Sequence, residues 1–308
     1  MSRILITGVR GFIGRALAPL LVADGHDVSG TSRDSAAQVD GVILHPVADL
    51  GREMDWAPVF QGVDAVVHLA AQVHTAADEA THMRVNAEGT QALAEAAAAA
   101  GVCRFVYLST VKVHGEETPP GAAFAEDDPP RPEDAYGRSK WAAEQALVGV
   151  SGLQTVILRP PLVYGPGVGA NFAALLRLCD RGIPLPFGAI DNRRSLVYRG
   201  NLVDAIRLSL IHENAPGCTF LVSDGSPVST PDLVRAIRAA QGRTPGLIPL
   251  PGGVLRAAAA LAWRSAAADR LIGSLAVDDS LIRQRLGWQP PFAMADGLAA
   301  TVADSGTN

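Results

Sequence analysis

The stretch RILITGVRGFIG, residues 3–14, holds a short apolar run followed at once by three regularly spaced glycines. The run predicts a buried strand, and the residues after the glycines, FIGRALAPLLVADG, predict a helix. Glycine permits a tight turn and lets a phosphate group approach the backbone, and a helix start offers free N–H groups. The spacing is not that of GxGxxG, so a turn without a ligand stays open, and the strand and helix context carries the prediction. We predict that a dinucleotide pyrophosphate contacts Gly8, Gly11, Phe12, Ile13 and Gly14.

The same alternation of apolar runs and helical stretches continues through the first two-thirds of the chain. Continuous apolar strands between helices predict a parallel sheet buried on both faces. We therefore expect an α/β fold, a Rossmann doubly wound parallel sheet, over residues 1–165, and a helical stretch over residues 78–100. The further strands are expected at DVSGT (27–31), GVILHPV (41–47), DAVVHLA (64–70), RFVYLST (104–110) and QTVILRP (154–160).

The regular alternation of strands and helices ends after Tyr164, where YGPGVGAN predicts a turn rich in glycine and proline. Short helical and strand-like pieces with proline-rich joints follow. They predict a smaller C-terminal α/β lobe over residues 166–308. A segment near residues 195–223 is a candidate to return to the first lobe.

Composition narrows the classes of function. The net charge is −5, which argues against nucleic acid as the main partner, because phosphate contacts need a basic face. No signal peptide is visible, and the Ala-rich stretch from Val254 to Trp263 contains Arg256 and is too short to span a bilayer. Three scattered cysteines form neither a disulfide framework nor a metal cluster. We expect a cytoplasmic protein without a metal site or a membrane partner.

The end of the second strand bears on the choice of nicotinamide cofactor. An acid there binds the ribose 2′-hydroxyl of NAD, and an arginine accommodates the 2′-phosphate of NADP. Ser32 stands where the acid is expected, and Arg33 follows, which favours NADP. Asp34 could still turn inward and Arg33 could be a plain exposed residue, so NAD stays open. Asp49 and Leu50, after the third strand, are candidate neighbours of the adenine.

A tyrosine and a lysine stand four residues apart at the start of a predicted helix, in YGRSKWAAE (136–144), and so share a face. The Lys140 ammonium would stabilise the anion of Tyr136, which suits proton transfer at a sugar hydroxyl while hydride moves at its carbon. Ser109 and Thr110 end the strand before it, at the edge where ligands of such folds bind, and we select Thr110 as the third group. The alternative is a packing tyrosine and a surface lysine.

Several motifs together resemble one family: TGVRGFIG, HLAA, VNAEGT, YLSTVKVHGE, YGRSK and RPPLVYGPG. They resemble the extended short-chain dehydrogenase/reductases, the NAD-dependent epimerase/dehydratase family, over nearly the whole chain. The resemblance implies a catalytic triad of Thr110, Tyr136 and Lys140, the last two also touching the cofactor, and a second lobe that grips a nucleotide sugar. It further implies cofactor contacts at Leu69, Ala70, Ala71 and Asn86, and contacts of the substrate with Thr110, Asn171 and Arg194. Arg193 could take the place of Arg194.

The reaction is less sharply defined than the family. Dehydratases of the family carry an Asp-Glu pair where this chain has Val111 and Lys112, which argues against 4,6-dehydration. Later segments resemble enzymes that reduce a UDP-4-keto-6-deoxy-N-acetylhexosamine for surface polysaccharides, and they also occur in proteins called UDP-glucose 4-epimerases. We rank reduction at C4 of a UDP-sugar first, 4-epimerisation with bound NAD second, and a non-catalytic NADP-binding regulator last. Family members often dimerise through helices near residues 86–100 and 136–150, so we expect a homodimer, although that face could pack within the monomer.

Overall fold

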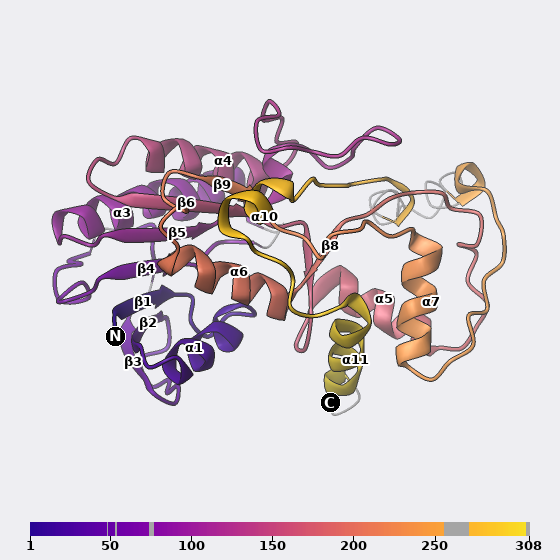
Figure 1. Ribbon diagram of the computed structural model, residues 1–308, viewed down its shortest axis with the longest axis horizontal. Helices are drawn as coiled ribbons and strands as arrows, with labels where there is room; N and C mark the ends of the chain where they lie inside the picture. The colour runs from indigo at the N-terminus through magenta and orange to yellow at the C-terminus, as the bar shows by residue number, and fades with distance from the viewer. Residues whose placement is uncertain (48, 53, 74–76, 256–270, 306–308) are drawn as a thin grey trace.

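The computed structural model describes residues 1–47, 49–52, 54–73, 77–255 and 271–305 (Figure 1). Its centre is a seven-stranded sheet in the order β3-β2-β1-β4-β5-β6-β9, with every neighbouring pair parallel. This order is that of a doubly wound sheet, so the predicted fold class is confirmed. The strands are β1 (Arg3–Thr7), β2 (Asp27–Ser32), β3 (Val42–Pro46), β4 (Ala65–His68), β5 (Arg104–Leu108), β6 (Gln154–Arg159) and β9 (Thr219–Leu221).

Helices cover both faces of the sheet. Successive side chains of a strand point to opposite faces, so Ile4 and Ile6 enter one core cluster and Leu5 enters the other. Helices α1 (Gly14–Ala23) and α6 (Arg199–Ile211) lie on the first face. Helices α3 (Gly89–Ala99) and α4 (Ala135–Val148) lie on the second face, and Figure 1 shows α4 above the strands.

The predicted helical stretch at residues 78–100 is not one uniform α-helix. It begins as α2 (Glu79–His82), continues as a π-helix (Met83–Glu88) and ends as α3. A π-helix is uncommon and often marks a functional position. This one carries Asn86.

The rest of the chain forms a second group of elements, which Figure 1 shows beside the carboxyl ends of the strands. Strands β7 (Leu162–Tyr164) and β8 (Leu196–Tyr198) make a parallel pair. Helices α5 (Ala170–Asp180), α7 (Thr230–Ala240) and α11 (Met294–Ser305) surround a third core cluster. In the sequence, α6 and β9 come between α5 and α7, and both belong to the main sheet and its helix layer. Helix α10 (Ser280–Leu286) packs on β9. A division of the chain at residue 165 stays a prediction.

The small-residue helix α3 is packed on one side only. Leu93, Ala94 and Ala97 are buried in the core, whereas Ala92 and Ala99 are exposed. The homodimer predicted through this helix therefore depends on its exposed face and stays a prediction. Among the described residues, no helix has the length and apolarity needed to cross a bilayer. The Ala-rich stretch from Val254 to Trp263 lies, from residue 256 onward, outside the described residues.

Candidate active site

The glycine turn joins β1 to α1 in a conformation that only glycine adopts easily. Gly8 has φ +69°, and a Cβ there would lie 3.0 Å from the backbone of Ala70. A Cβ on Gly14 would lie 2.5 Å from the Gly8 carbonyl oxygen, so the helix begins in contact with the turn. Gly11 is exposed, and its missing Cβ would meet only the Gly8 oxygen, at 3.0 Å. The turn is therefore closely packed at Gly8 and Gly14 and exposed at Gly11, which suits a pyrophosphate lying on the N-terminus of α1.

The loop after β4, which holds Leu69, Ala70 and Ala71, forms the wall beside this turn. Side chains hold two N–H groups of this loop: the Ala70 N–H donates to Thr7 Oγ1 at 3.2 Å, and the Gln72 N–H donates to Asn86 Oδ1 at 2.7 Å. The Asn86 Nδ2 group donates to the Gln72 carbonyl at 3.0 Å and to Ser139 Oγ at 2.9 Å. Asn86 thus ties the cofactor wall to α4.

The end of β2 lies beside an ion pair, Arg10 with Asp34, that the sequence did not reveal. Ser32 is buried and caps the chain at Asp34, whose N–H donates to Ser32 Oγ at 3.2 Å. Arg10, from the glycine turn, makes an ion pair of 3.1 Å with the Asp34 carboxylate. Arg33 is exposed. Asp34 is thus paired with Arg10, and Arg33 follows Ser32 at the strand end where a ribose 2′-substituent is expected.

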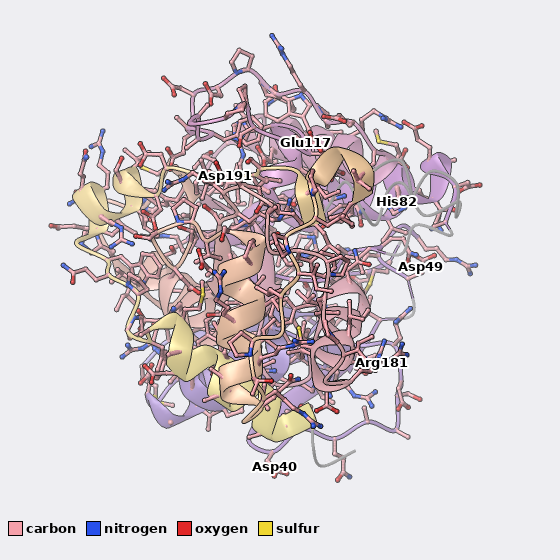
Figure 2. All side chains as sticks on the ribbon, turned by 90° about the vertical axis from the view of Figure 1, so that its right-hand side faces the viewer. Asp40, Asp49, His82, Glu117, Arg181 and Asp191 are labelled. Carbon is pink, nitrogen blue, oxygen red and sulfur yellow. The ribbon has the colours of Figure 1, made fainter. Side chains whose placement is uncertain are left out.

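Asp49 takes part in a different contact from the one predicted for it. Its carboxylate accepts a hydrogen bond of 2.8 Å from Arg84 on the π-helix, which holds the Asp49 pKa below its ordinary value. The next residue, Leu50, packs on α3, where a Cβ on Gly89 would lie 2.7 Å from the Leu50 carbonyl oxygen. Figure 2 shows Asp49 on the same side of the molecule as His82, which ends α2. Both residues lie where the loop meets the helices, and their role toward an adenine stays a prediction.

Tyr136 lies in the first turn of α4, and Asp134 begins that helix by accepting the Gly137 N–H at 2.6 Å. The tyrosine is half-buried, and its ring packs edge-on against His82 with centroids 6.3 Å apart. Burial, followed by the nearby Asp134 charge, raises the Tyr136 pKa above its ordinary value. The resting side chain is therefore a neutral phenol, which can donate a proton.

Lys140 follows one turn later and is only 2% exposed. Its ammonium lies 4.2 Å from the centroid of the Tyr107 ring, a cation–π contact with β5. Burial lowers the Lys140 pKa to about 7, although the Glu144 charge acts in the opposite direction. Among the described residues, no hydrogen bond joins Lys140 to the Tyr136 hydroxyl. The shared helical face is present, but Lys140 would influence the phenol through its charge.

The two hydroxyls at the end of β5 are distinguished by their contacts. Ser109 Oγ donates to the buried Glu144 carboxylate on α4. Thr110 caps the short 3₁₀-helix Val111–Val113 and accepts the Lys112 N–H at 3.3 Å. Because Ser109 is committed to a carboxylate, Thr110 has the hydroxyl better able to reach a substrate oxygen.

Lys112 occupies the place of a dehydratase acid and has a clear structural role. Its ammonium contacts Glu116 at 2.6 Å and Asp134 at 2.7 Å, so it links the strand end to the cap of α4. Burial alone would lower its pKa, but the Asp134 and Glu116 carboxylates raise it. The chain has only two lysines, and both Lys112 and Lys140 lie at this site.

The substrate contacts predicted in the second group of elements are less closely assembled. Asn171 is exposed at the start of α5, next to Ala170, which has φ +51°. Arg194 is half-buried, and its guanidinium donates to the Gly273 carbonyl at 2.9 Å. Arg193 is exposed and faces a different cavity. The described contacts do not join Asn171 to Arg194, so their common role toward a diphosphate stays a prediction.

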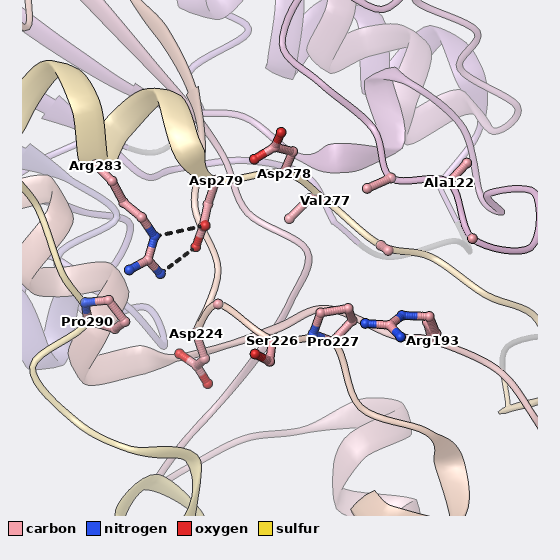
Figure 3. Close-up of a pocket in the computed structure, with 14 residues that line it drawn as sticks. Ala122, Arg193, Asp224, Ser226, Pro227, Val277, Asp278, Asp279, Arg283 and Pro290 are labelled. Atoms are coloured by element: carbon pink, nitrogen blue, oxygen red, sulfur yellow. Dashed lines mark hydrogen bonds and ion pairs between the residues drawn. The ribbon is translucent and has the colours of Figure 1, made fainter.

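A separate cavity of about 730 Å³ lies near the end of β9 and includes none of the triad residues (Figure 3). Three of its charged groups have partners in the structure. Arg283 makes two contacts of 2.9 Å with Asp279, and Asp224 accepts hydrogen bonds from Tyr164 and Asn201. The predicted catalytic residues thus lie outside this cavity, at the end of β5 and on α4. Its lining residues are Gly121, Ala122, Ala123, Arg193, Asp224, Gly225, Ser226, Pro227, Ala276, Val277, Asp278, Asp279, Arg283 and Pro290.

The residues that sequence reasoning missed are mostly partners of those it selected. Tyr107 and His82 are aromatic neighbours of the Lys140 and Tyr136 side chains. Glu144 stands four residues after Lys140, so helical spacing could have indicated it. Among the described residues, no group of three or more His, Cys, Asp or Glu side chains could hold a metal ion.

Comparison with known proteins points to one family. The profile of the NAD dependent epimerase/dehydratase family matches residues 4–222. A UDP-glucose 4-epimerase of Vibrio cholerae is 40% identical over 97% of this chain and 94% of its own length. A UDP-glucose 4-epimerase of Mycolicibacterium smegmatis is 33% identical over 97% of each chain. The solved structure of MoeE5 with UDP-glucuronic acid and NAD superposes with a TM-score of 0.79, at 25% identity over 99% of each chain.

Proposed function

Since the chain belongs to the NAD dependent epimerase/dehydratase family, we propose that it is a nucleotide-sugar enzyme that acts at C4 of a UDP-sugar. The favoured reaction is reduction of a UDP-4-keto-6-deoxy-N-acetylhexosamine. The observation that carries the proposal is the packing of α4, which holds Tyr136 and Lys140, on the end of β5. Lys140 lies over the Tyr107 ring, and Glu144 of the same helix accepts the hydroxyl of Ser109, the residue before Thr110. Relatives named UDP-glucose 4-epimerase and a structure containing a UDP-sugar support the class of substrate.

Each triad side chain has a definite task in this reaction. The neutral Tyr136 phenol donates its proton to the C4 oxygen as the carbonyl becomes a hydroxyl. The Lys140 ammonium stabilises the phenolate left behind, since an opposite charge nearby favours the ionised form. The Thr110 hydroxyl holds the same sugar oxygen. A bound nicotinamide cofactor would supply the hydride.

The residues present suit a dinucleotide. The open side of Gly11 and the N-terminus of α1 would hold its pyrophosphate, and the loop with Ala70 would line its groove. We propose NADP as the preferred form. Ser32 replaces the acid that would bind a ribose 2′-hydroxyl, and Arg33 supplies positive charge beside it, whereas Arg10 is paired with Asp34. NAD is the alternative, because related structures contain NAD.

The second candidate is 4-epimerisation of UDP-glucose or UDP-N-acetylglucosamine with bound NAD. One observation favours it: the relative at 40% identity over nearly the whole chain is named a UDP-glucose 4-epimerase. The same triad serves both reactions, because an epimerase removes and returns hydrogen at one carbon. The non-catalytic regulator is least supported, since the tyrosine and lysine are both retained.

Two incubations separate the candidates. In the first, the protein receives NADPH and the 4-keto-6-deoxy sugar, and loss of the absorbance of reduced nicotinamide is followed. In the second, it receives UDP-glucose or UDP-N-acetylglucosamine without added reductant, and the 4-epimers are separated by chromatography. We expect turnover in the first. Epimers in the second would assign the epimerase, and no turnover in either would overturn the proposal.

A further inference from the structure

A buried ionic network lies next to the triad residues, and the function proposed above gives it no role. Its centre is the Glu144 carboxylate, which is 1% exposed. Arg159, at the end of β6 and 4% exposed, donates to it through Nε at 3.0 Å and through Nη2 at 2.5 Å. The pair is bidentate and almost completely removed from water, which is the strong form of such a contact.

The network joins two catalytic elements that are distant in the sequence. Glu144 stands on α4, one turn after Lys140 and two turns after Tyr136. The same carboxylate accepts the hydroxyl of Ser109, the residue that precedes Thr110 at the end of β5. One anion therefore holds the strand end that carries one catalytic hydroxyl and the helix that carries the other.

A further arm of the network reaches the loop after Thr110. Arg159 Nη1 lies 2.9 Å from His114 Nε2 and donates to the Glu126 carbonyl at 3.2 Å. Because a guanidinium only donates, His114 Nε2 accepts, and the imidazole is neutral. Burial and then the Arg159 charge lower the His114 pKa to about 4, in agreement with that state. The loop is thus anchored by a contact that does not titrate near neutral pH.

We propose that Glu144 is a positioning residue: its carboxylate fixes the Thr110 strand end against the helix of Tyr136 and Lys140, and sets a negative charge one helical turn from the Lys140 ammonium. The catalytic part of this inference rests on the proposed function. The part that concerns charge does not, because it describes the protein without substrate.

The charge of Glu144 acts on a lysine that burial would otherwise neutralise. Around Lys140 lie the Tyr107 ring, Tyr136 on its own helix, and His68 on β4, whose pKa is lowered to about 3 by burial and then by the Lys140 charge. At neutral pH neither the Tyr107 ring nor the His68 ring carries a charge. Glu144 is the carboxylate that raises the Lys140 pKa. Removing its charge should make the lysine lose its proton at lower pH.

The effect of the Glu144 charge on Lys140 can be measured by NMR without an activity assay. The chain has only two lysines, so the spectrum is simple. Lysine labelled with ¹³C at Cε gives one NMR signal for Lys140 and one for Lys112, the internal reference. In Glu144→Gln we expect the Lys140 pKa to fall by about one unit, with Lys112 unchanged. An unmoved Lys140 pKa would overturn the part of the proposal that concerns charge. Glu213→Gln, at an exposed glutamate after α6, is the matched control.

The positioning role needs a variant that leaves the buried ion pair intact, because Glu144→Gln leaves Arg159 without its anion, and the loss of stability would mix with any effect on kcat. Ser109→Ala removes only the link from the strand end. We expect kcat to fall by about tenfold or more, with KM nearly unchanged and the Lys140 pKa unmoved. Wild-type kcat in Ser109→Ala would overturn the positioning role. An inactive wild-type protein with the expected NMR shifts would instead refute the proposed function.

Discussion

Replacing Lys140 by methionine should make the cofactor-free protein more stable while it removes activity. The ammonium is 2% exposed, and burial lowers its pKa from 10.5 to about 7. At pH 7 such a shift corresponds to about 4 kcal/mol of lost stability, because the unfolded chain binds a proton that the folded chain disfavours. Methionine has a similar length, carries no charge and packs well on an aromatic ring such as Tyr107. We therefore expect the free energy of unfolding to rise by at least about 2 kcal/mol.

The pH dependence has a definite sign. Below pH 7 the folded and unfolded states both carry the Lys140 proton, and the cost of burying the charge is present in full. As the pH rises from about 7 to 10.5, the folded protein loses the proton first and the cost declines to zero. The advantage of Lys140→Met over the wild type should therefore be largest below pH 7 and vanish near pH 10.5.

The other lysine provides the control. Lys112 lies 2.6 Å from Glu116 and 2.7 Å from Asp134, and its side chain is 28% exposed. Lys112→Met should therefore lower stability, by about 1 kcal/mol after allowance for solvent screening. Urea unfolding of the three proteins between pH 6 and 10 measures both effects. The reasoning fails if Lys140→Met is no more stable than the wild type at pH 7, or if its advantage is independent of pH.

Four further outcomes are expected. Tyr136→Phe should lower kcat by about a hundredfold or more while the Kd of the cofactor stays within about twofold, by fluorescence titration; near-normal turnover would exclude the proton transfer. Arg33→Asp should move the ratio of NADP and NAD dissociation constants toward NAD, and an unchanged ratio would remove the argument for NADP. Gly8→Ala should cost about 1–3 kcal/mol and weaken cofactor binding, because φ is +69° and the new Cβ would lie 3.0 Å from a neighbouring backbone; Gly25→Ala, with φ +83° and no atom within 4 Å, should leave cofactor binding unchanged. His68, with a pKa near 3, is neutral when folded and charged when unfolded, so acid should reduce stability below about pH 6.5, and a stability curve flat from pH 6.5 to 4 would contradict this.

The fold could be predicted because it depends on patterns that are local in the sequence. The apolar runs around Leu5 and Val106 alternate with helical stretches, and the parallel sheet follows from that alternation. The π-helix at Met83–Glu88 could not be foreseen, since its backbone shift has no residue signature distinct from an ordinary helix. Its consequence is chemical, because Asn86 lies within it and holds the loop beside the glycine turn.

For the candidate site, the sequence indicated the proposed reacting groups but not the residues that contact them. The four-residue spacing indicated Tyr136 and Lys140, but the partner of Lys140 is Tyr107, on another element of the fold. Thr110 was selected from the sequence, and the structure adds that the neighbouring Ser109 hydroxyl donates to Glu144. Contacts between residues far apart in the chain have no periodic signal, so they emerged only with the structure.

The placement of both lysines makes proteolysis a direct report on the contact between the end of β5 and α4. A protease that cuts after lysine finds Lys140 inside a helix and Lys112 held between two carboxylates. Cleavage at both would release the peptide from Val113 to Lys140, which contains Tyr136, the proposed proton donor. The rate of that cut measures how often the strand end and α4 separate. Any nucleotide or sugar that holds them together would slow the digestion, so binding could be ranked on a gel before a reaction is known.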